Sequence, residues 1–284
     1  MRFLSLLAVL TFGLPAFAAD DTYDLRGPAP KKGLAVTHAS TMKIKDADVT
    51  VTVMGMKIDL NQTLDIVSDE DVEVLEVKGR EIVKSKTVIT KESVNTTSSI
   101  NGNEMKEDKT SVLQGERIIA EKGKDGKWKN ALEDGKPTDE QKKELDKREG
   151  PESDDDVFPE GKVKVGHAWK VDASKIKSIT GGTIAEASGE MKLKFLKVEK
   201  IDGDECAVIE IRGTIKGKMK EDGAPDLEMA ITSTAWRSLK SGIEVKSTIT
   251  GTMKIEGTIK MGDDDIGLKF EGKVEGTGTA SLKK

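Results

Sequence analysis

The stretch IEVKSTITGTMKIEGTIKM, residues 243–261, decides the fold class of this chain of 284 residues. Every even position in it is Lys, Glu or Thr, and every odd position is apolar or small. A period of two residues places the two kinds of side chain on opposite faces of a β-strand. The stretch is also about three times as long as a usual strand of ~5–6 residues. We therefore predict a long strand with one buried face and one solvated face.

Three further segments in the second half show the same alternation, and residues that favour turns separate them. Strands joined by short turns pair as antiparallel neighbours. The second half is therefore predicted to be an antiparallel meander. Its other alternating segments are 207–219, 227–235 and 266–282, and its turns are 202–204, 221–225, 241–242 and 262–265.

The apolar faces of these segments contain glycines, which indicate a curved sheet. Glycine removes side-chain bulk and allows a strand to bend, and neighbouring strands twist by roughly 20–25°. The expected fold class is all-β, with long, curved antiparallel strands that form a meander, a part-barrel or a sandwich. The glycines concerned are Gly251, Gly257, Gly272, Gly276 and Gly278.

The first half also contains strand patterns, but its alternation is less regular. The apolar phase switches near Gly55, which predicts a bulge or a turn there. Asn101-Gly102 and Lys124-Asp125-Gly126 are hairpin-turn sequences. The strand candidates are 49–53, 54–60, 72–77, 81–90, 93–100, 110–113 and 116–121.

One short helix is predicted between the two β halves, at 138–149. Thr138 stands at its start and Gly150-Pro151 at its end, which are typical positions for these residues. Leu145 is its only large apolar residue, so we expect the helix to be exposed. The acidic run at 152–156 that follows is expected to be a solvated linker.

The first residues have the features of a secretory signal peptide. Arg2 supplies a positive start, an apolar segment follows, and Ala16-Phe17-Ala18 is a cleavage pattern. We expect a periplasmic or secreted protein with no transmembrane segment in the mature chain. The expected organisation is a signal peptide at 1–19, an N-terminal β half at 20–135, a short helix and acidic linker at 136–158, and a C-terminal antiparallel β half at 159–284.

The composition narrows the function. The chain has 46 Lys and Arg against 51 Asp and Glu, which is not the basic balance of a nucleic-acid-binding protein. Two His and one Cys are few ligands for zinc or iron, so no metal or other cofactor is expected. The single Cys206 cannot form an internal disulfide and is expected to pack as a small apolar residue.

The sequence offers no convergent set of nucleophile, histidine and carboxylate. Ser40-Thr41-Met42-Lys43 matches the S-x-x-K motif of penicillin-binding proteins, but Ser40 lies in a β pattern and not at the start of a helix. His38 and His167 also lie in strand patterns and are expected to be structural. The acidic runs at 154–156 and 263–265 lack the spacing of a calcium loop. We therefore expect no catalytic residues and no enzymatic activity.

The apolar faces allow two interpretations that the sequence does not separate. They meet each other in a closed core, or they leave a cavity for an apolar ligand. Met suits such a cavity because its flexible side chain adapts to different ligands. The residues expected to line the cavity are Ile249, Met253, Ile255, Ile259 and Phe270.

The segment FPEGKVKVGHAW, residues 158–169, carries an F-P-x…V-x-V-G-x-x-W motif. It resembles a family of uncharacterised secreted bacterial all-β proteins, which pair a β half rich in Met, Lys and Thr with a second β half. The resemblance implies a two-part β fold and assigns no activity. Members often carry a lipoprotein cysteine, which this chain lacks, so membrane anchoring does not carry over. From the residues themselves, Phe158, Val163, Val165 and Trp169 are expected to be core anchors.

Together these observations predict an exported, non-catalytic binding or structural protein of the bacterial cell envelope. The alternative is a periplasmic carrier of a lipid or lipophilic ligand in a cavity of the curved sheet. The expected partner is therefore a lipophilic ligand or an envelope protein, and not nucleic acid.

Overall fold

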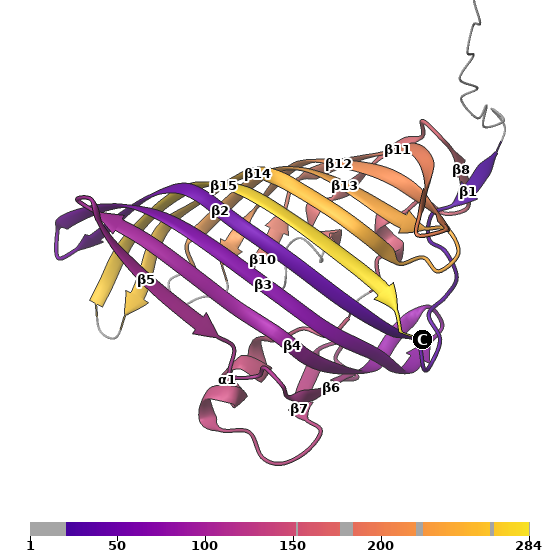
Figure 1. The fold of residues 1–284 in the computed structure, drawn as a ribbon, viewed down its shortest axis with the longest axis horizontal. Helices are drawn as coiled ribbons and strands as arrows, with labels where there is room; N and C mark the ends of the chain where they lie inside the picture. Colours follow the sequence, from indigo (N-terminus) through magenta and orange to yellow (C-terminus); the bar gives the residue numbers. More distant parts are fainter. Residues whose placement is uncertain (1–20, 152, 177–183, 220–223, 262–263, 284) are drawn as a thin grey trace, which may run out of the picture.

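The computed structural model describes residues 21–151, 153–176, 184–219, 224–261 and 264–283. The predicted signal peptide at 1–19 and parts of the predicted turns at 221–225 and 262–265 lie outside these residues. The described chain forms one antiparallel sheet of 13 strands, a separate two-stranded sheet and one α-helix (Figure 1). The predicted all-β class with long antiparallel strands is confirmed.

The second half forms the predicted meander. Asp202 and Gly203, in its first turn, have φ angles of +49° and +91°, which suit a type I′ hairpin turn. Each strand pairs with the next over most of its length. The strands are β11 (Glu190–Ile201), β12 (Asp204–Met219), β13 (Asp226–Ser238), β14 (Glu244–Met261) and β15 (Asp264–Leu282).

The first half contains longer strands than its broken alternation predicts. Turns form at Gly55 and at Asn101-Gly102, as expected. Bulges interrupt the alternation without ending the strands, for example at Asp46, where φ is +49°. The expected strand at 110–113 is wrong, because the chain turns at 111–115. The strands are β2 (Ala35–Val53), β3 (Met56–Lys78), β4 (Glu81–Ile100), β5 (Asn103–Thr110), β6 (Arg117–Lys122) and β7 (Trp128–Leu132).

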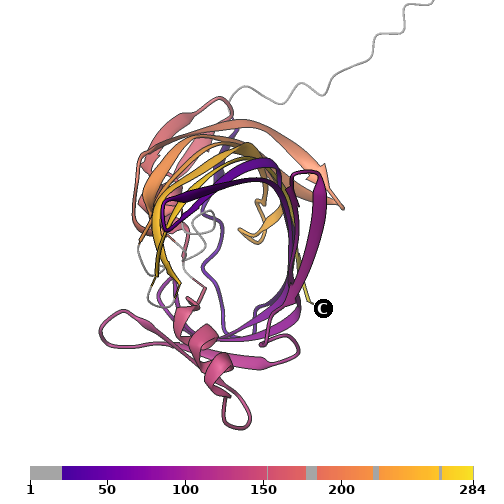
Figure 2. The ribbon, with the colours of Figure 1, turned by 90° about the vertical axis from the view of Figure 1, so that its left-hand side faces the viewer.

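The two halves share one continuous sheet, because the last strand pairs with the first long one. Strand β15 runs antiparallel to β2 from the pair Val36–Leu282 to the pair Thr52–Gly267. The strand order is β7-β6-β4-β3-β2-β15-β14-β13-β12-β11-β9, with β5 also on β4 and β10 (Ile184–Ser188) on β12. Seen from one end, the sheet curls around a central axis without closing on itself (Figure 2). We call its concave side the inner face and its convex side the outer face.

The predicted helix forms as α1 (Asp139–Lys147). Thr138 and Gln141 make a capping box, in which each side chain accepts a hydrogen bond from the other residue's backbone N–H. The expectation of an exposed helix is wrong for its apolar residue. Leu145 is buried against Ile89 and Ile118, which lie on distant strands.

The largest apolar cluster lies on the inner face of β11, β12 and β13. Phe195 and Ile209 are completely buried there. The cover is a layer formed by β1 (Thr22–Asp24), its partner β8 (Lys162–Lys164) and the chain around them; Tyr23 meets the Phe195 ring edge-on, with the ring centroids 5.6 Å apart. Strand β9 (Ala168–Asp172) pairs with β11 at the end of the sheet.

The 158–169 segment runs from this cover into β9. Phe158, Val163 and Trp169 pack against the cluster, as predicted, and the Trp169 indole donates a hydrogen bond to the Val157 carbonyl at 2.8 Å. Val165 is not a core anchor, because it is 45% exposed in a turn with Gly166, whose φ is +91°.

Candidate functional site

The inner face is built of cross-strand rows, because directly opposed residues in an antiparallel pair point to the same side. Strands β3, β2, β15 and β14 lie next to one another and contribute one residue each to a row. Successive rows are about 7 Å apart, since every second residue of a strand faces the same side at ~3.3–3.4 Å per residue. The chemistry of the site therefore follows from the order of these rows along the strands.

At one end the rows are apolar and partly open. Val51 lies opposite both Ile58 and Leu268, and Val53 lies opposite Met56 at the hairpin tip. Met56 is 66% exposed and Ile58 43% exposed, although both side chains are large and apolar. We call this end of the inner face the mouth, defined by Val51, Val53, Met56, Ile58, Ile259, Ile266 and Leu268.

The middle rows are apolar and more tightly packed. Val49 and Phe270 are opposite each other and buried, as are Ile44 and Val274 in a row further along. Gly272 allows this packing, because a Cβ there would lie 2.7 Å from the Ile44 side chain. The apolar side chains that pack against these rows are only partly buried: Met42, Val51, Leu60, Leu64, Met253, Ile255 and Leu268.

A groove of about 490 Å³ is centred on the next row, and the chain neighbours of the residues in this row also line it: Thr41, Lys43, Asp65, Val67, Thr248, Thr250, Glu275 and Thr277. Met42 occupies the centre of this row, opposite Ile66 on one side and Gly276 on the other. Ile249 completes the row, and a Cβ on Gly276 would lie 2.8 Å from the Ile249 side chain. Gly276 thus allows Ile249 to pack directly against the neighbouring strand in this row.

The five residues predicted to line a cavity share the inner face, but they do not form one site. Ile249 lines the groove, Phe270 is 8% exposed in the packed middle, and Ile259 lies at the mouth. Met253 and Ile255 are partly buried and pack against the middle rows.

Sequence reasoning missed Met42 and Ile66, which line the groove from the first half of the chain. Both lie in period-two patterns. The bulge at Asp46 shifts the phase of one of these patterns, and nothing local predicts that β2 pairs with β15.

Beyond the groove the inner face becomes polar. Ser40 lies opposite both Ser68 and Gly278, and in the next row His38 lies opposite Glu70. Glu92, on β4, lies opposite Ser68. We call His38, Ser40, Ser68, Glu70 and Glu92 the polar patch.

Arg148, just after α1, binds the polar patch. One of its terminal nitrogens, Nη1, lies 3.1 and 3.2 Å from the two carboxylate oxygens of Glu92, and Nη2 lies 3.5 Å from Glu70 Oε2. These three side chains are between 25 and 29% exposed. The contact ties the end of the helix to the inner face.

His38 is exposed to solvent but surrounded by the curled sheet. Desolvation by the protein around it lowers the pKa of the imidazole, while the carboxylate of Glu70 acts in the opposite direction. His38 is therefore mainly neutral at pH 7. Within the described ranges no hydrogen bond reaches its ring, so it is not the satisfied structural histidine that the sequence predicted.

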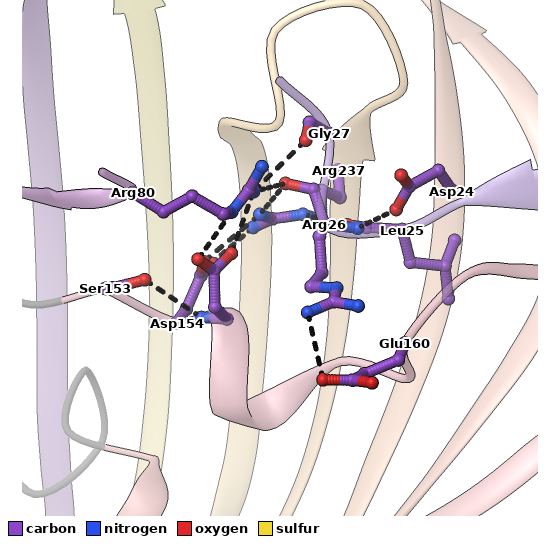
Figure 3. A network of polar contacts seen from close by, with 10 residues as sticks. Asp24, Leu25, Arg26, Gly27, Arg80, Ser153, Asp154, Glu160 and Arg237 are labelled. Carbon is purple, nitrogen blue, oxygen red and sulfur yellow. Dashed lines mark hydrogen bonds and ion pairs between the residues drawn. The ribbon is translucent and has the colours of Figure 1, made fainter. Parts of the chain in front are cut away.

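The far end of the inner face is held by two arginines and two aspartates (Figure 3). Arg237, on β13, is 5% exposed, binds both carboxylate oxygens of Asp154, and donates to the carbonyls of Leu25 at 2.5 Å and Arg26 at 3.0 Å. Its guanidinium also lies 4.3 Å from the centre of the Phe158 ring.

Arg80, in the turn between β3 and β4, makes the matching contact from the first half. Its nitrogens lie 2.6 and 2.8 Å from the Asp155 carboxylate oxygens, and it donates to the Gly27 carbonyl at 3.1 Å. The hydrogen bonds from Arg80 lower the pKa of Asp155. The run at 152–156 is therefore not simply a solvated linker, because Asp154 and Asp155 join the two halves of the chain.

The outer face carries charged and hydroxyl side chains in cross-strand pairs. Lys254 Nζ lies 2.9 Å from Glu271 Oε1, and the Thr41 and Thr277 hydroxyls are 3.0 Å apart. Other pairs are Lys43–Asp65, Lys45–Glu275, Lys86–Glu73 and Lys269–Glu256.

The structure does not assemble the sequence motifs weighed for catalysis. The Ser40 hydroxyl donates to the Ser68 carbonyl on the inner face, whereas Lys43 pairs with Asp65 on the outer face. Cys206 is buried, as predicted, and burial raises the pKa of its thiol. In the described part of the chain, no group of three or more His, Cys, Asp or Glu is placed to hold a metal ion.

Comparisons with known proteins add little to this geometry. No family model matches the chain, and no curated protein matches it. Among solved structures, the chain is similar to an outer membrane channel from Pseudomonas putida F1, with 7% identity over 89% of this chain and 97% of that chain. The TM-score is 0.27, and a similarity at that level supports no conclusion about function. None of the helices within the described ranges is long and apolar enough to cross a bilayer.

Proposed function

We propose that this protein is a non-catalytic binding protein of the bacterial cell envelope that carries a lipid or lipophilic ligand along the inner face of its sheet. The observation that carries the proposal is the groove of about 490 Å³ over Met42, Ile66 and Ile249, next to apolar side chains that are only partly buried. Covering partly exposed apolar side chains on a concave surface with a ligand is favourable, because it removes apolar area from water.

The length of the apolar surface suits an acyl chain. From Met56 at the mouth to Ile66 in the groove, β3 advances ten residues, or about 33 Å at ~3.3 Å per residue. An acyl chain spans roughly half of the ~30 Å hydrocarbon core of a bilayer, or about 15 Å. The apolar rows between mouth and groove are therefore longer than such a chain.

The outer face supports a carrier in water more than a protein embedded in lipid. Strands that face hydrocarbon carry apolar side chains outward, and Lys or Arg there costs about 2–4 kcal/mol at the midplane. Here many outward residues are charged or carry a hydroxyl, for example Lys254, Glu271 and Thr277. The signal-peptide pattern at 1–19 supports export of this carrier to the periplasm or the medium.

The test is native mass spectrometry, with organic extraction, of protein exported to the periplasm and purified without detergent. A bound species of lipid mass at near-stoichiometric occupancy is expected. A clean apo mass that does not change after incubation with a lipid extract contradicts the proposal and favours a structural or protein-binding module.

A matched pair of variants locates the ligand. Ile66, on β3, lines the groove, whereas Val88, on β4, is also partly buried but lies opposite Asp71 and therefore on the outer face. Ile66→Asn puts an amide into the groove and is expected to lower lipid occupancy, whereas Val88→Asn is expected to preserve it. Thermal unfolding of both variants separates a loss of ligand from a loss of fold.

A further inference from the structure

The chemistry of the inner face changes abruptly beside the groove. The groove row is apolar, and the next two rows toward the helix contain Ser40, Ser68, His38 and Glu70. These rows lie about 7 and 14 Å from the groove, since each row adds two residues along the strand. A ligand whose apolar part fills the groove therefore places its next few atoms against the polar patch.

The polar patch has an excess of negative charge. Glu70 and Glu92 carry two negative charges, and Arg148 carries one positive charge that is already paired with both of them. His38 adds little positive charge at pH 7, because the surrounding protein lowers its pKa. The edge strand β5 contributes Glu107 and Lys109 at inner-face positions, one charge of each sign.

Building on the proposed carrier function, we propose that the polar patch is the headgroup site, and that it takes an uncharged or cationic hydrogen-bond donor, such as a hydroxyl or an ammonium group, instead of a carboxylate or a phosphate. The carboxylate oxygens of Glu70 and Glu92 accept hydrogen bonds from such a donor. The Ser68 hydroxyl donates or accepts, and the Ser40 hydroxyl, which donates to the Ser68 carbonyl, accepts.

An anionic headgroup is disfavoured by the same residues. It would lie near two carboxylates inside a curved sheet, where water screens charges less than on an open surface. Arg148 does not offset this excess, because its one positive charge is paired with two carboxylates. A headgroup that donates hydrogen bonds instead takes the place of the water molecules that it displaces from Glu70 and Glu92.

The experiment is competition for a fluorescent apolar probe bound to the purified full chain at neutral pH. The competitors are a primary fatty alcohol, an alkylamine and a fatty acid of one chain length. We expect the alcohol and the amine to displace the probe at concentrations at least about tenfold lower than the fatty acid, as one unfavourable charge contact predicts. Displacement by the fatty acid at equal or lower concentrations overturns the inference.

Two variants assign the selectivity to the patch. Glu70→Gln removes one negative charge. It is expected to reduce, several-fold, the ratio between the concentrations of fatty acid and amine that displace the probe. Glu73→Gln is the control, because Glu73 lies on the same strand but pairs with Lys86 on the outer face. Ser68→Ala leaves every ion pair in place and is expected to weaken binding of the alcohol. If this ratio is unchanged in folded Glu70→Gln, the polar patch is not the headgroup site.

The outcomes separate this inference from the carrier function. If the probe does not bind, and native protein carries no lipid, both fail. If the probe binds and all three competitors displace it equally, the carrier function stands and the headgroup assignment alone is wrong.

Discussion

Two regions of this sheet follow the same sequence rule and reach different states of burial. In the second half, Phe195 and Ile209 on the inner face are completely buried under the layer formed by β1, β8 and the chain around them. On β14 and β2, Ile249 and Met42 also occupy inner-face positions, yet they remain partly exposed. Alternation specifies which side chains face inward. Whether they form a core or a binding surface depends on which segments cover them.

The largest loss of stability is expected in the region that β1 and β8 cover. Phe195→Ala is expected to lower the free energy of unfolding by about 3–5 kcal/mol, because it leaves a cavity in a filled core. Ile249→Ala is expected to cost only about 1 kcal/mol, since its side chain is already partly in water. Urea denaturation of both variants measures the difference. Equal losses would mean that the groove is as closed as the core.

The two arginines at the far end of the inner face should also differ in their contribution to stability, because Arg237 is buried and Arg80 is partly exposed. Arg237→Met removes a guanidinium whose side chain is 6% exposed and with it the hydrogen bonds to Asp154, to the Leu25 carbonyl and to the Arg26 carbonyl, of which the last keeps a hydrogen bond from Arg80 at 3.4 Å. The expected cost is about 3 kcal/mol. Arg80→Met, at a side chain 38% exposed, is expected to cost about 1 kcal/mol. Chemical denaturation tests this order, and a larger loss at Arg80 would contradict it.

A smaller effect is expected where α1 covers the first half. Leu145→Ala should cost about 2 kcal/mol, at the low end for a buried leucine, because Leu145 is the single buried residue of a short helix. Thr138→Ala removes the cap and should cost about 1 kcal/mol. Limited proteolysis near 139–147 is expected to accelerate in both variants. Unchanged cleavage in Leu145→Ala would show that the helix is held by other contacts, such as that of Arg148.

The sequence predicts the strands of the second half well because period-two alternation is a local signal. It does not predict the groove, because Met42 meets Gly276 only through the pairing of β2 with β15, which are at opposite ends of the chain. The burial of Leu145 depends on partners that are distant in sequence. The same is true of Asp154 and Asp155, whose charge indicates solvation until Arg237 and Arg80 are placed beside them.

The smallest effect concerns the pH dependence of stability that His38 contributes in the polar patch. The protein around His38 lowers its pKa below the ordinary value of 6.5, so the unfolded chain binds this proton more readily than the folded chain. The stability that neutral His38 contributes is therefore complete above about pH 6.5 and decreases as the pH falls toward the folded pKa. Glu244 acts in the opposite sense, because desolvation raises the pKa of its carboxyl, but it is present in every variant compared.

His38→Gln is therefore expected to reduce the loss of stability between about pH 7.5 and pH 5.5, because glutamine has no proton to gain. Urea midpoints measured across this range give the slope for each variant. His167→Gln is the matched control, since His167 stacks on Trp169 at the start of β9 with ring centroids 5.7 Å apart, and this variant retains His38. An unchanged slope in His38→Gln would mean that His38 is as well hydrated in the folded protein as in the unfolded chain. That result would contradict the lowered pKa of its imidazole.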